Sequence, residues 1–256
     1  MSEANQTPPA APNKPWILLI GGSGLVGSMI GPALHANYQL RVLDLHEPEY
    51  AVDDLVTASV LDFDALVRAC TGVEVVVYLA MGPKDKENWA APEVEKGQFD
   101  VNVTGLYLSL RAAAQAGVHR VVLTSSMSVF DEHPSSEPGR HARTNATDAY
   151  GLSKRLGEDV CAAAVSEYGI SATALRLSLP MSDEEYLAQP DPTRQAKCTA
   201  ATDVVAAFTA AVHRRGEGFT PVQIAGDPAG RFHDLAPARE LLGWEPQIVP
   251  GRAGDA

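Results

Sequence analysis

A glycine-rich segment near the start of the chain constrains the fold more than any other feature. Residues 21–27 read GGSGLVG, directly after an apolar run of strand type and directly before a stretch with helical periodicity, Leu25–His35. Gly21 permits a tight turn, Gly24 lets the backbone approach a phosphate group, and Gly27 lets the helix pack closely on the sheet. This order of strand, turn and helix predicts a dinucleotide site, with the pyrophosphate at the helix N-terminus.

Apolar runs of strand type alternate with helical stretches along most of the chain. Residues 75–79, VVVYL, are continuously apolar, which is typical of a strand buried on both faces of a parallel sheet. The alternation predicts an α/β fold, a Rossmann doubly wound parallel sheet with helices on both faces. The expected strands are 16–20, 40–43, 55–60, 73–79, 120–125, 172–177 and 222–225. The expected helices are 25–35, a short one after residue 62, 99–116, 149–167, 202–213 and one ending near residue 242.

Three segments are expected along the 256 residues. Residues 1–14 form a disordered tail rich in proline and polar residues, 15–180 form the nucleotide-binding domain, and 181–250 form a small substrate-binding lobe packed on the same domain. The start of the chain lacks the apolar run of a signal peptide, and the sequence contains no stretch of the ~20 apolar residues that a membrane helix needs. We therefore expect a cytoplasmic protein without a membrane contact.

Charge and cysteine usage exclude several classes of function. The formal net charge of -12 argues against nucleic acid as a partner. The three cysteines, Cys70, Cys161 and Cys198, are far apart and lack CxxC spacing, and the seven histidines show no metal-binding spacing. We expect reduced cysteines and no metal ion.

An acidic residue ends the second expected strand. Asp44 follows Gly24 by twenty residues, where a carboxylate can accept hydrogen bonds from the adenosine ribose and repel the 2′-phosphate of NADP. NAD is therefore the expected cofactor. The alternative is that Asp44 only opens a loop. Asp62, which follows the third expected strand, could cap the next helix, contact the cofactor, or do both.

Three polar residues predict proton-transfer chemistry. Tyr150 and Lys154 lie in YGLSK, one turn apart on an expected helix, so their side chains share a face. A nearby ammonium favours the ionised phenol, which suits a base, although this spacing is common by chance. Ser126 lies at the carboxyl end of the fifth strand, where open parallel sheets bind ligands. Ordinary strand-end capping is the alternative for Ser126 and for Ser125.

The order of these motifs resembles that of the extended short-chain dehydrogenase/reductase family, the NAD-dependent epimerase/dehydratase group. The resemblance covers residues 16–246 and rests on GGSGLVG, Asp44, Asp62, VVYLAM, DVNVTG, VVLTSSMSVF and YGLSK. It implies an enzyme, an NAD-dependent oxidoreductase. In it, Tyr150 is the general acid/base, Lys154 binds the nicotinamide ribose and lowers the pKa of Tyr150, and Ser126 orients the substrate.

The resemblance also implies a set of cofactor contacts that begins at the glycine turn and ends beside the nicotinamide. These residues are Gly21, Gly24, Leu25, Val26, Gly27, Asp44, Asp62, Phe63, Leu79, Ala80, Met81, Asn102, Tyr150, Lys154 and Leu179.

The expected size of the substrate follows from the length of the last segment. Because only about 75 residues follow Pro180, a small sugar-like substrate is favoured over a sugar nucleotide. Within the family, the uronate dehydrogenases are the most similar group, and this likeness implies substrate contacts from Ser126, Met127 and Arg194, with Arg194 on a sugar carboxylate. Met127 and Pro83 stand where that group has polar contacts.

Two other functions stay open at this point. One is an epimerase or dehydratase that oxidises and then reduces its substrate, and the other is a non-catalytic NAD-sensing protein. The resemblance also implies a homodimer formed through the helices expected at 99–116 and 149–167.

Overall fold

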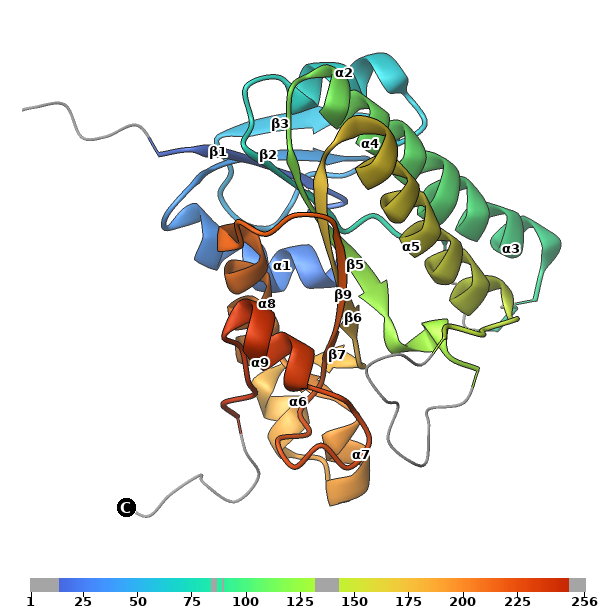
Figure 1. Cartoon of the computed structure of the whole chain (residues 1–256), viewed down its shortest axis with the longest axis vertical. Helices are drawn as coiled ribbons and strands as arrows, with labels where there is room; N and C mark the ends of the chain where they lie inside the picture. Colours follow the sequence, from blue (N-terminus) through green and yellow to red (C-terminus); the bar gives the residue numbers. More distant parts are fainter. Residues whose placement is uncertain (1–13, 84–86, 89, 132–142, 249–256) are drawn as a thin grey trace, which may run out of the picture.

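The computed structural model describes residues 14–83, 87–88, 90–131 and 143–248, and it is built around a parallel sheet of seven strands (Figure 1). The order across the sheet is β3-β2-β1-β4-β5-β6-β9, and every neighbouring pair is parallel. The strands are β1 Trp16–Ile20, β2 Gln39–Asp44, β3 Asp54–Thr57, β4 Val75–Tyr78, β5 Arg120–Ser126, β6 Ser171–Leu177 and β9 Phe219–Ile224. The chain moves outward from β1 to β3 and then returns to the other side of β1, which creates a switch point between β1 and β4. The expected Rossmann fold is confirmed.

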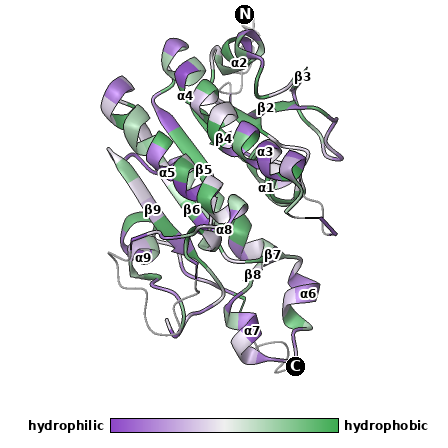
Figure 2. Ribbon diagram, turned by 90° about the vertical axis from the view of Figure 1, so that its right-hand side faces the viewer, coloured by the Kyte–Doolittle hydropathy of each residue, from purple (hydrophilic) through white to green (hydrophobic). Residues whose placement is uncertain are grey.

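Helices cover both faces of the sheet and enclose two apolar cores. On one face lie α1 Leu25–His35, α8 Ala201–His213 and α9 Ala236–Leu242, and on the other lie α2 Phe63–Cys70, α4 Leu106–Gln115 and α5 Ala149–Tyr168 (Figure 1). Alternate side chains of β1 enter opposite cores, Ile17 and Leu19 on the α1 side and Leu18 and Ile20 on the α4 side. Apolar colour follows much of β5, β6 and β9 in Figure 2, as burial on both faces requires.

One helical segment is longer than the sequence pattern indicates. The helix expected from residue 99 starts at Pro92, as α3 Pro92–Phe99, passes through a π-helical segment at Asp100–Gly105, and continues as α4. Proline is well tolerated in the first turn of a helix because its missing N–H has no partner there. The polar residues of α3 conceal this start from a search for apolar periodicity.

The segment after β6 also contains more regular structure than expected. A small sheet pairs two short strands, β7 Pro180–Met181 and β8 Thr199–Ala200. Between these strands, the chain forms two short helices, α6 Asp183–Leu187 and α7 Pro192–Ala196. Ser182 and Glu185 form a capping box that starts α6. The later elements α8, β9 and α9 belong to the main layers, so only part of the predicted lobe stands outside the sheet sandwich.

Among the residues that the structure describes, no helix is both long and apolar enough to cross a membrane. The described histidines, cysteines and acidic residues form no group of three suited to a metal ion. Cys70, Cys161 and Cys198 are buried free thiols. The expected tail, 1–14, lies almost wholly outside the described residues.

Candidate active site

A cavity of about 830 Å³ opens at the carboxyl ends of the strands, at the switch point between β1 and β4. One end is formed by the turn between β1 and α1, by the end of β2 and by the residues after β3. The other end is formed by the ends of β5 and β6 and by the start of α5. The lining includes Gly21, Gly24, Leu25, Val26, Gly27, Asp44, Leu79, Ala80, Met81, Ser126, Tyr150, Lys154 and Leu179.

The glycine turn is closed by contacts that no side chain would permit. Gly21 has a φ of 83°, and a Cβ there would lie 2.3 Å from the backbone nitrogen of Ala80. A Cβ on Gly27 would lie 1.9 Å from the carbonyl oxygen of Gly22. Helix α1 then begins after Gly24 with no side-chain cap and no acidic residue in its first turn. Such a helix start favours an anion because of its N–H groups and its dipole.

Asp44 is held beside this turn by backbone hydrogen bonds. Its Oδ2 accepts a hydrogen bond from the backbone nitrogen of Ser23 at 2.9 Å, and its Oδ1 accepts from the backbone nitrogens of Leu45 at 2.7 Å and His46 at 3.3 Å. The carboxylate therefore orders the loop after β2 and also lines the cavity. The loop role of Asp44 is therefore present in the structure, and its contact with the adenosine ribose stays a prediction.

Tyr50 supports the glycine turn from behind. Its hydroxyl donates a hydrogen bond to the carbonyl oxygen of Gly22 at 2.9 Å, and its ring packs where a Cβ on Gly31 would lie 2.2 Å away. Burial raises the pKa of Tyr50 to about 12, so the donating hydroxyl stays protonated. Sequence reasoning missed this residue because it lies in a loop without a motif.

Ser126, Tyr150 and Lys154 meet at the other end of the cavity. Ser126 ends β5, where its Oγ accepts a hydrogen bond from the backbone nitrogen of Ser128 at 3.1 Å. Tyr150 lies in the first turn of α5, and Lys154 follows one turn later. The Lys154 Nζ donates to the carbonyl oxygen of Thr124 at 3.0 Å and lies 6.0 Å from the centre of the Tyr150 ring. Tertiary packing therefore gathers the three residues that the sequence analysis selected.

Burial dominates the electrostatics of Tyr150. Desolvation raises the pKa of its hydroxyl above the ordinary value, the hydrogen bond with Ser126 lowers it, and the nearby Asp148 carboxylate raises it again. The lowering of the Tyr150 pKa by Lys154 stays a prediction.

The comparisons with known proteins identify the family. Residues 17–241 match the NAD dependent epimerase/dehydratase family. The chain belongs to this family. NAD is therefore the cofactor expected at the cavity.

Relatives within and near the family differ in what their names say they act on. The chain is 28% identical over 169 residues to a uronate dehydrogenase of Pseudomonas syringae pv. tomato, covering 63% of this chain and 58% of that protein. It is 27% identical over 189 residues to an L-arabinose 1-dehydrogenase of Haloferax volcanii, covering 68% and 71%. The first curated relatives are matched over only 39% to 58% of their own length.

A solved structure confirms the fold. The glucuronic acid dehydrogenase of Chromohalobacter salexigens superposes with a TM-score of 0.78 at 21% identity, covering 94% of this chain and 91% of that chain.

The residues present fit the family's cofactor. The glycine turn and the start of α1 suit a pyrophosphate, and Asp44 stands at the strand end beside them. In the described lining, the buried Oγ1 of Thr124 has no hydrogen-bond partner. Buried hydroxyls are normally paired, so a bound group that donates or accepts there would satisfy it.

Asp62 and Phe63 lie outside the described lining, in contrast to the family-based expectation. Asp62 caps α2 by accepting a hydrogen bond from its first turn at 3.0 Å. Because β3 ends at Thr57 rather than at residue 60, the residues that follow the strand and line the cavity are 58–60. The helix-cap reading of Asp62 is the one that the geometry shows.

Asn102 is buried in the helix layer and is likewise absent from the described lining. Its Oδ1 accepts a hydrogen bond from the backbone nitrogen of Gly82 at 3.1 Å, and its Nδ2 donates to Gln98 at 2.9 Å and to Ser153 at 2.9 Å. Asn102 therefore connects the segment after β4 to α5, between the two halves of the cavity wall.

The two remaining substrate residues, Met127 and Arg194, lie outside the described lining of the cavity. Met127 is 1% exposed and packs with Val129 and Phe130. Arg194 lies exposed on α7, outside the described lining. Within that lining Lys154 is the one residue with a fixed positive charge, so no described arginine stands there to hold a carboxylate.

Sequence reasoning also missed several lining residues that follow strand ends. They are Leu45, His46, Glu47 and Glu49 after β2, Ala58, Ser59 and Val60 after β3, and Thr124, Ser125, Ser128 and Leu177 at the ends of β5 and β6. The rule that ligands bind at the carboxyl ends of parallel strands would have found most of them, had the ends of the strands been known.

Gly21→Ala should weaken NAD binding because its Cβ would meet the Ala80 backbone and displace the turn. We expect the dissociation constant for NAD to rise about tenfold or more, since the phosphate needs the close approach to the backbone that this turn permits. NADH fluorescence titration measures this.

Gly72→Ala is the matched control for that variant. Gly72 has a similar φ of 77° with no atom within 4 Å of an added Cβ, so it should lose about 1 kcal/mol of stability to backbone strain and keep its NAD affinity. Equal NAD affinity in the two variants would contradict the role given to the turn.

Proposed function

We propose that this chain is an NAD-dependent oxidoreductase that moves hydride between NAD and a hydroxyl-bearing carbon of a sugar or sugar acid. The observation that carries the proposal is a single cavity with a nucleotide-type glycine turn and Asp44 at one end and Ser126, Tyr150 and Lys154 at the other. Family membership supports the same chemistry.

The protein groups then have distinct tasks. NAD, when bound, supplies the hydride acceptor. Tyr150 Oη takes the proton of the substrate hydroxyl, and Ser126 Oγ holds the same oxygen by a hydrogen bond. The Lys154 ammonium, fixed by the Thr124 carbonyl, donates to the ribose hydroxyls on the nicotinamide side. Asp44 accepts from the adenosine ribose.

Leu179 supplies an apolar wall beside the reaction centre. It has a φ of 36°, rare for a residue with a side chain, and its side chain is 57% exposed where it lines the cavity. Strained backbone and exposed apolar surface both cost free energy, and such costs are concentrated at functional sites. A flat ring such as that of nicotinamide would cover this side chain.

Fewer observations bear on the identity of the sugar. The names of two relatives specify a uronate and L-arabinose, so both acidic and neutral sugars belong in a substrate search. The assignment of Arg194 to a carboxylate, the contact from Met127 and the homodimer stay predictions.

An epimerase is the second candidate. The chain is 31% identical over 146 residues to an N-acetyl-alpha-D-glucosaminyl-diphospho-ditrans,octacis-undecaprenol 4-epimerase of Escherichia coli O157:H7, which covers 56% of this chain and 42% of that protein. An epimerase would return the hydride to its substrate and leave no net NADH.

The deciding experiment is NADH absorbance with excess NAD and a panel of free uronic acids, neutral sugars and sugar nucleotides. We expect at least one free sugar or uronic acid to give NADH, and Tyr150→Phe to lower kcat by about 100-fold or more because the proton acceptor is lost. The affinity of that variant for NAD should stay within about threefold, since the ring remains. An isomerised substrate without NADH would instead establish the epimerase.

The pH dependence follows from the raised pKa of Tyr150. The base form is the phenolate, whose share rises as the pH approaches the pKa from below, so alcohol oxidation should accelerate from pH ~7 to pH ~10. In the cofactor-free protein, ultraviolet titration of tyrosinate should give the same curve for the unchanged chain and for Tyr150→Phe below pH ~10, because Tyr150 ionises later. A missing tyrosinate near pH ~7 in the variant would contradict this.

Asp44→Asn should shift the cofactor preference. The amide oxygen still accepts from the backbone nitrogens of Leu45 and His46, the hydrogen bond from Ser23 is lost, and the charge that repels a 2′-phosphate is removed, so affinity for NADP should rise about tenfold relative to NAD. The control Asp54→Asn removes the same charge from an ion pair with Arg41 on β2, outside the described lining. Parallel changes in the two variants would indicate an effect of net charge alone.

A further inference from the structure

A buried ionic network lies behind the candidate catalytic residues. The Glu158 carboxylate on α5 accepts a hydrogen bond from Ser125 Oγ at 2.6 Å through Oε1. Arg176 on β6 donates its Nε to the same oxygen at 2.9 Å and its Nη2 to Oε2 at 2.6 Å. The side chains of Arg176 and Glu158 are only 13% and 6% exposed. One carboxylate therefore links β5, β6 and α5.

The network reaches the cavity at both strand ends. Ser125 itself lines the cavity and stands between Ser126 and Thr124, whose carbonyl holds the Lys154 ammonium. Ser125 faces Arg176 in the parallel register, and Ser126 faces Leu177, which lines the cavity.

Helix α5 places Glu158 in line with two of the candidate catalytic residues. Tyr150, Lys154 and Glu158 follow at four-residue intervals along α5, so all three lie on the face that packs against β5. Glu158 thus contacts the strand, through Ser125, one turn beyond Lys154.

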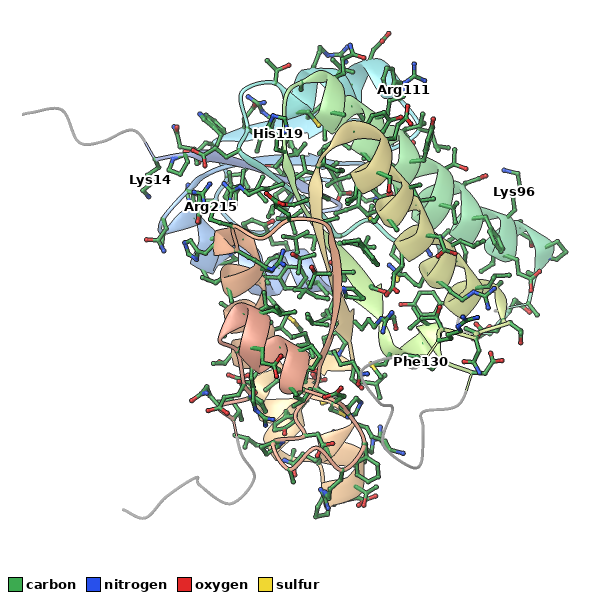
Figure 3. All side chains as sticks on the ribbon, viewed as in Figure 1. Lys14, Lys96, Arg111, His119, Phe130 and Arg215 are labelled. Carbon is green, nitrogen blue, oxygen red and sulfur yellow. The ribbon has the colours of Figure 1, made fainter. Side chains whose placement is uncertain are left out.

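The network is better suited to fixing geometry than to adding stability. Removing two charges from water costs several kcal/mol each, and a buried ion pair is often replaceable by apolar residues without loss of stability. Its bidentate geometry fixes the direction of both side chains. The Arg176 guanidinium also lies over the Phe130 ring, 5.2 Å from its centre. Phe130 follows the carboxyl end of β5, and His119, far from it in Figure 3, precedes the other end.

We propose that Glu158 is a positioning residue for hydride transfer, acting through Ser125 and Arg176 on the ends of β5 and β6. The carboxylate keeps Ser126 and the Thr124 carbonyl at a fixed distance from Tyr150 and Lys154. The proposal rests on the proposed function, because it assumes that Ser126, Tyr150 and Lys154 perform the reaction.

The test compares Ser125→Ala with Ser109→Ala. Both variants remove one buried serine hydroxyl that donates a hydrogen bond, to Glu158 in the first case and to the Gly105 carbonyl within the helix layer in the second. Kinetics use the substrate that gives the most NADH in the panel. Ser125→Ala should lower kcat about tenfold with both KM values within about threefold, because small misplacements of reacting groups act on the transition state. Ser109→Ala should stay within about twofold in kcat while losing comparable thermal stability.

A second readout does not need turnover. The fluorescence lifetime of bound NADH reports the surroundings of its nicotinamide ring, and it should change in Ser125→Ala and Glu158→Gln but not in Ser109→Ala. If no panel compound is oxidised by the unchanged chain, the proposed dehydrogenase function fails, and the positioning role is judged from this lifetime. Unchanged kcat in Ser125→Ala, or an unchanged lifetime where kcat is not measurable, overturns the inference. The test remains decisive even if Glu158→Gln does not fold, because the outcome is judged from Ser125→Ala.

Discussion

The contact between the glycine turn and the end of β4 is the constraint on which the rest of the structure depends. Gly21 and Ala80 approach so closely that a single added carbon would displace one of them. This approach brings the turn between β1 and α1 against the segment after β4, across the switch point of the sheet. The cavity exists because two neighbouring strands send their chains to opposite sides at this place.

A second meeting of elements, β5 with α5, completes the cavity. The strand contributes Ser126 and the Thr124 carbonyl, and the helix contributes Tyr150 and Lys154. In the proposed reaction, the hydroxyl, the phenol and the ammonium converge on one substrate oxygen and one ribose, so both elements are needed. The Glu158 network gives this convergence a physical basis, because it joins the strand and the helix through charge-assisted hydrogen bonds rather than through apolar contact alone.

The free protein holds Tyr150 in an environment that opposes ionisation. Burial and the Asp148 carboxylate both raise its pKa, and Ser126 alone of the three influences opposes them. Tyr150, the base in the proposed reaction, therefore stays protonated in the absence of ligands. Burial also strengthens the electrostatic interactions in the cavity, including those of the Lys154 ammonium, so the enclosure that opposes ionisation in the free protein would also support activation of Tyr150 in the proposed reaction.

The sequence by itself determined the features that depend on neighbours along the chain. The bounds of β1 and α1, the continuously apolar β4, the glycine turn and the four-residue spacing of Tyr150 and Lys154 are local, because periodicity and backbone freedom are properties of short segments. The tertiary structure alone decided where strands end and which side chains face the cavity. Strand β3 ends at Thr57, so residues 58–60 line the cavity and Asp62 does not. Met127 is buried in an apolar cluster, and Arg194 lies on the surface. The tertiary structure also placed Glu158 against Ser125 and Arg176. These outcomes depend on contacts between residues far apart in the chain, and no local pattern encodes the packing free energy that selects them.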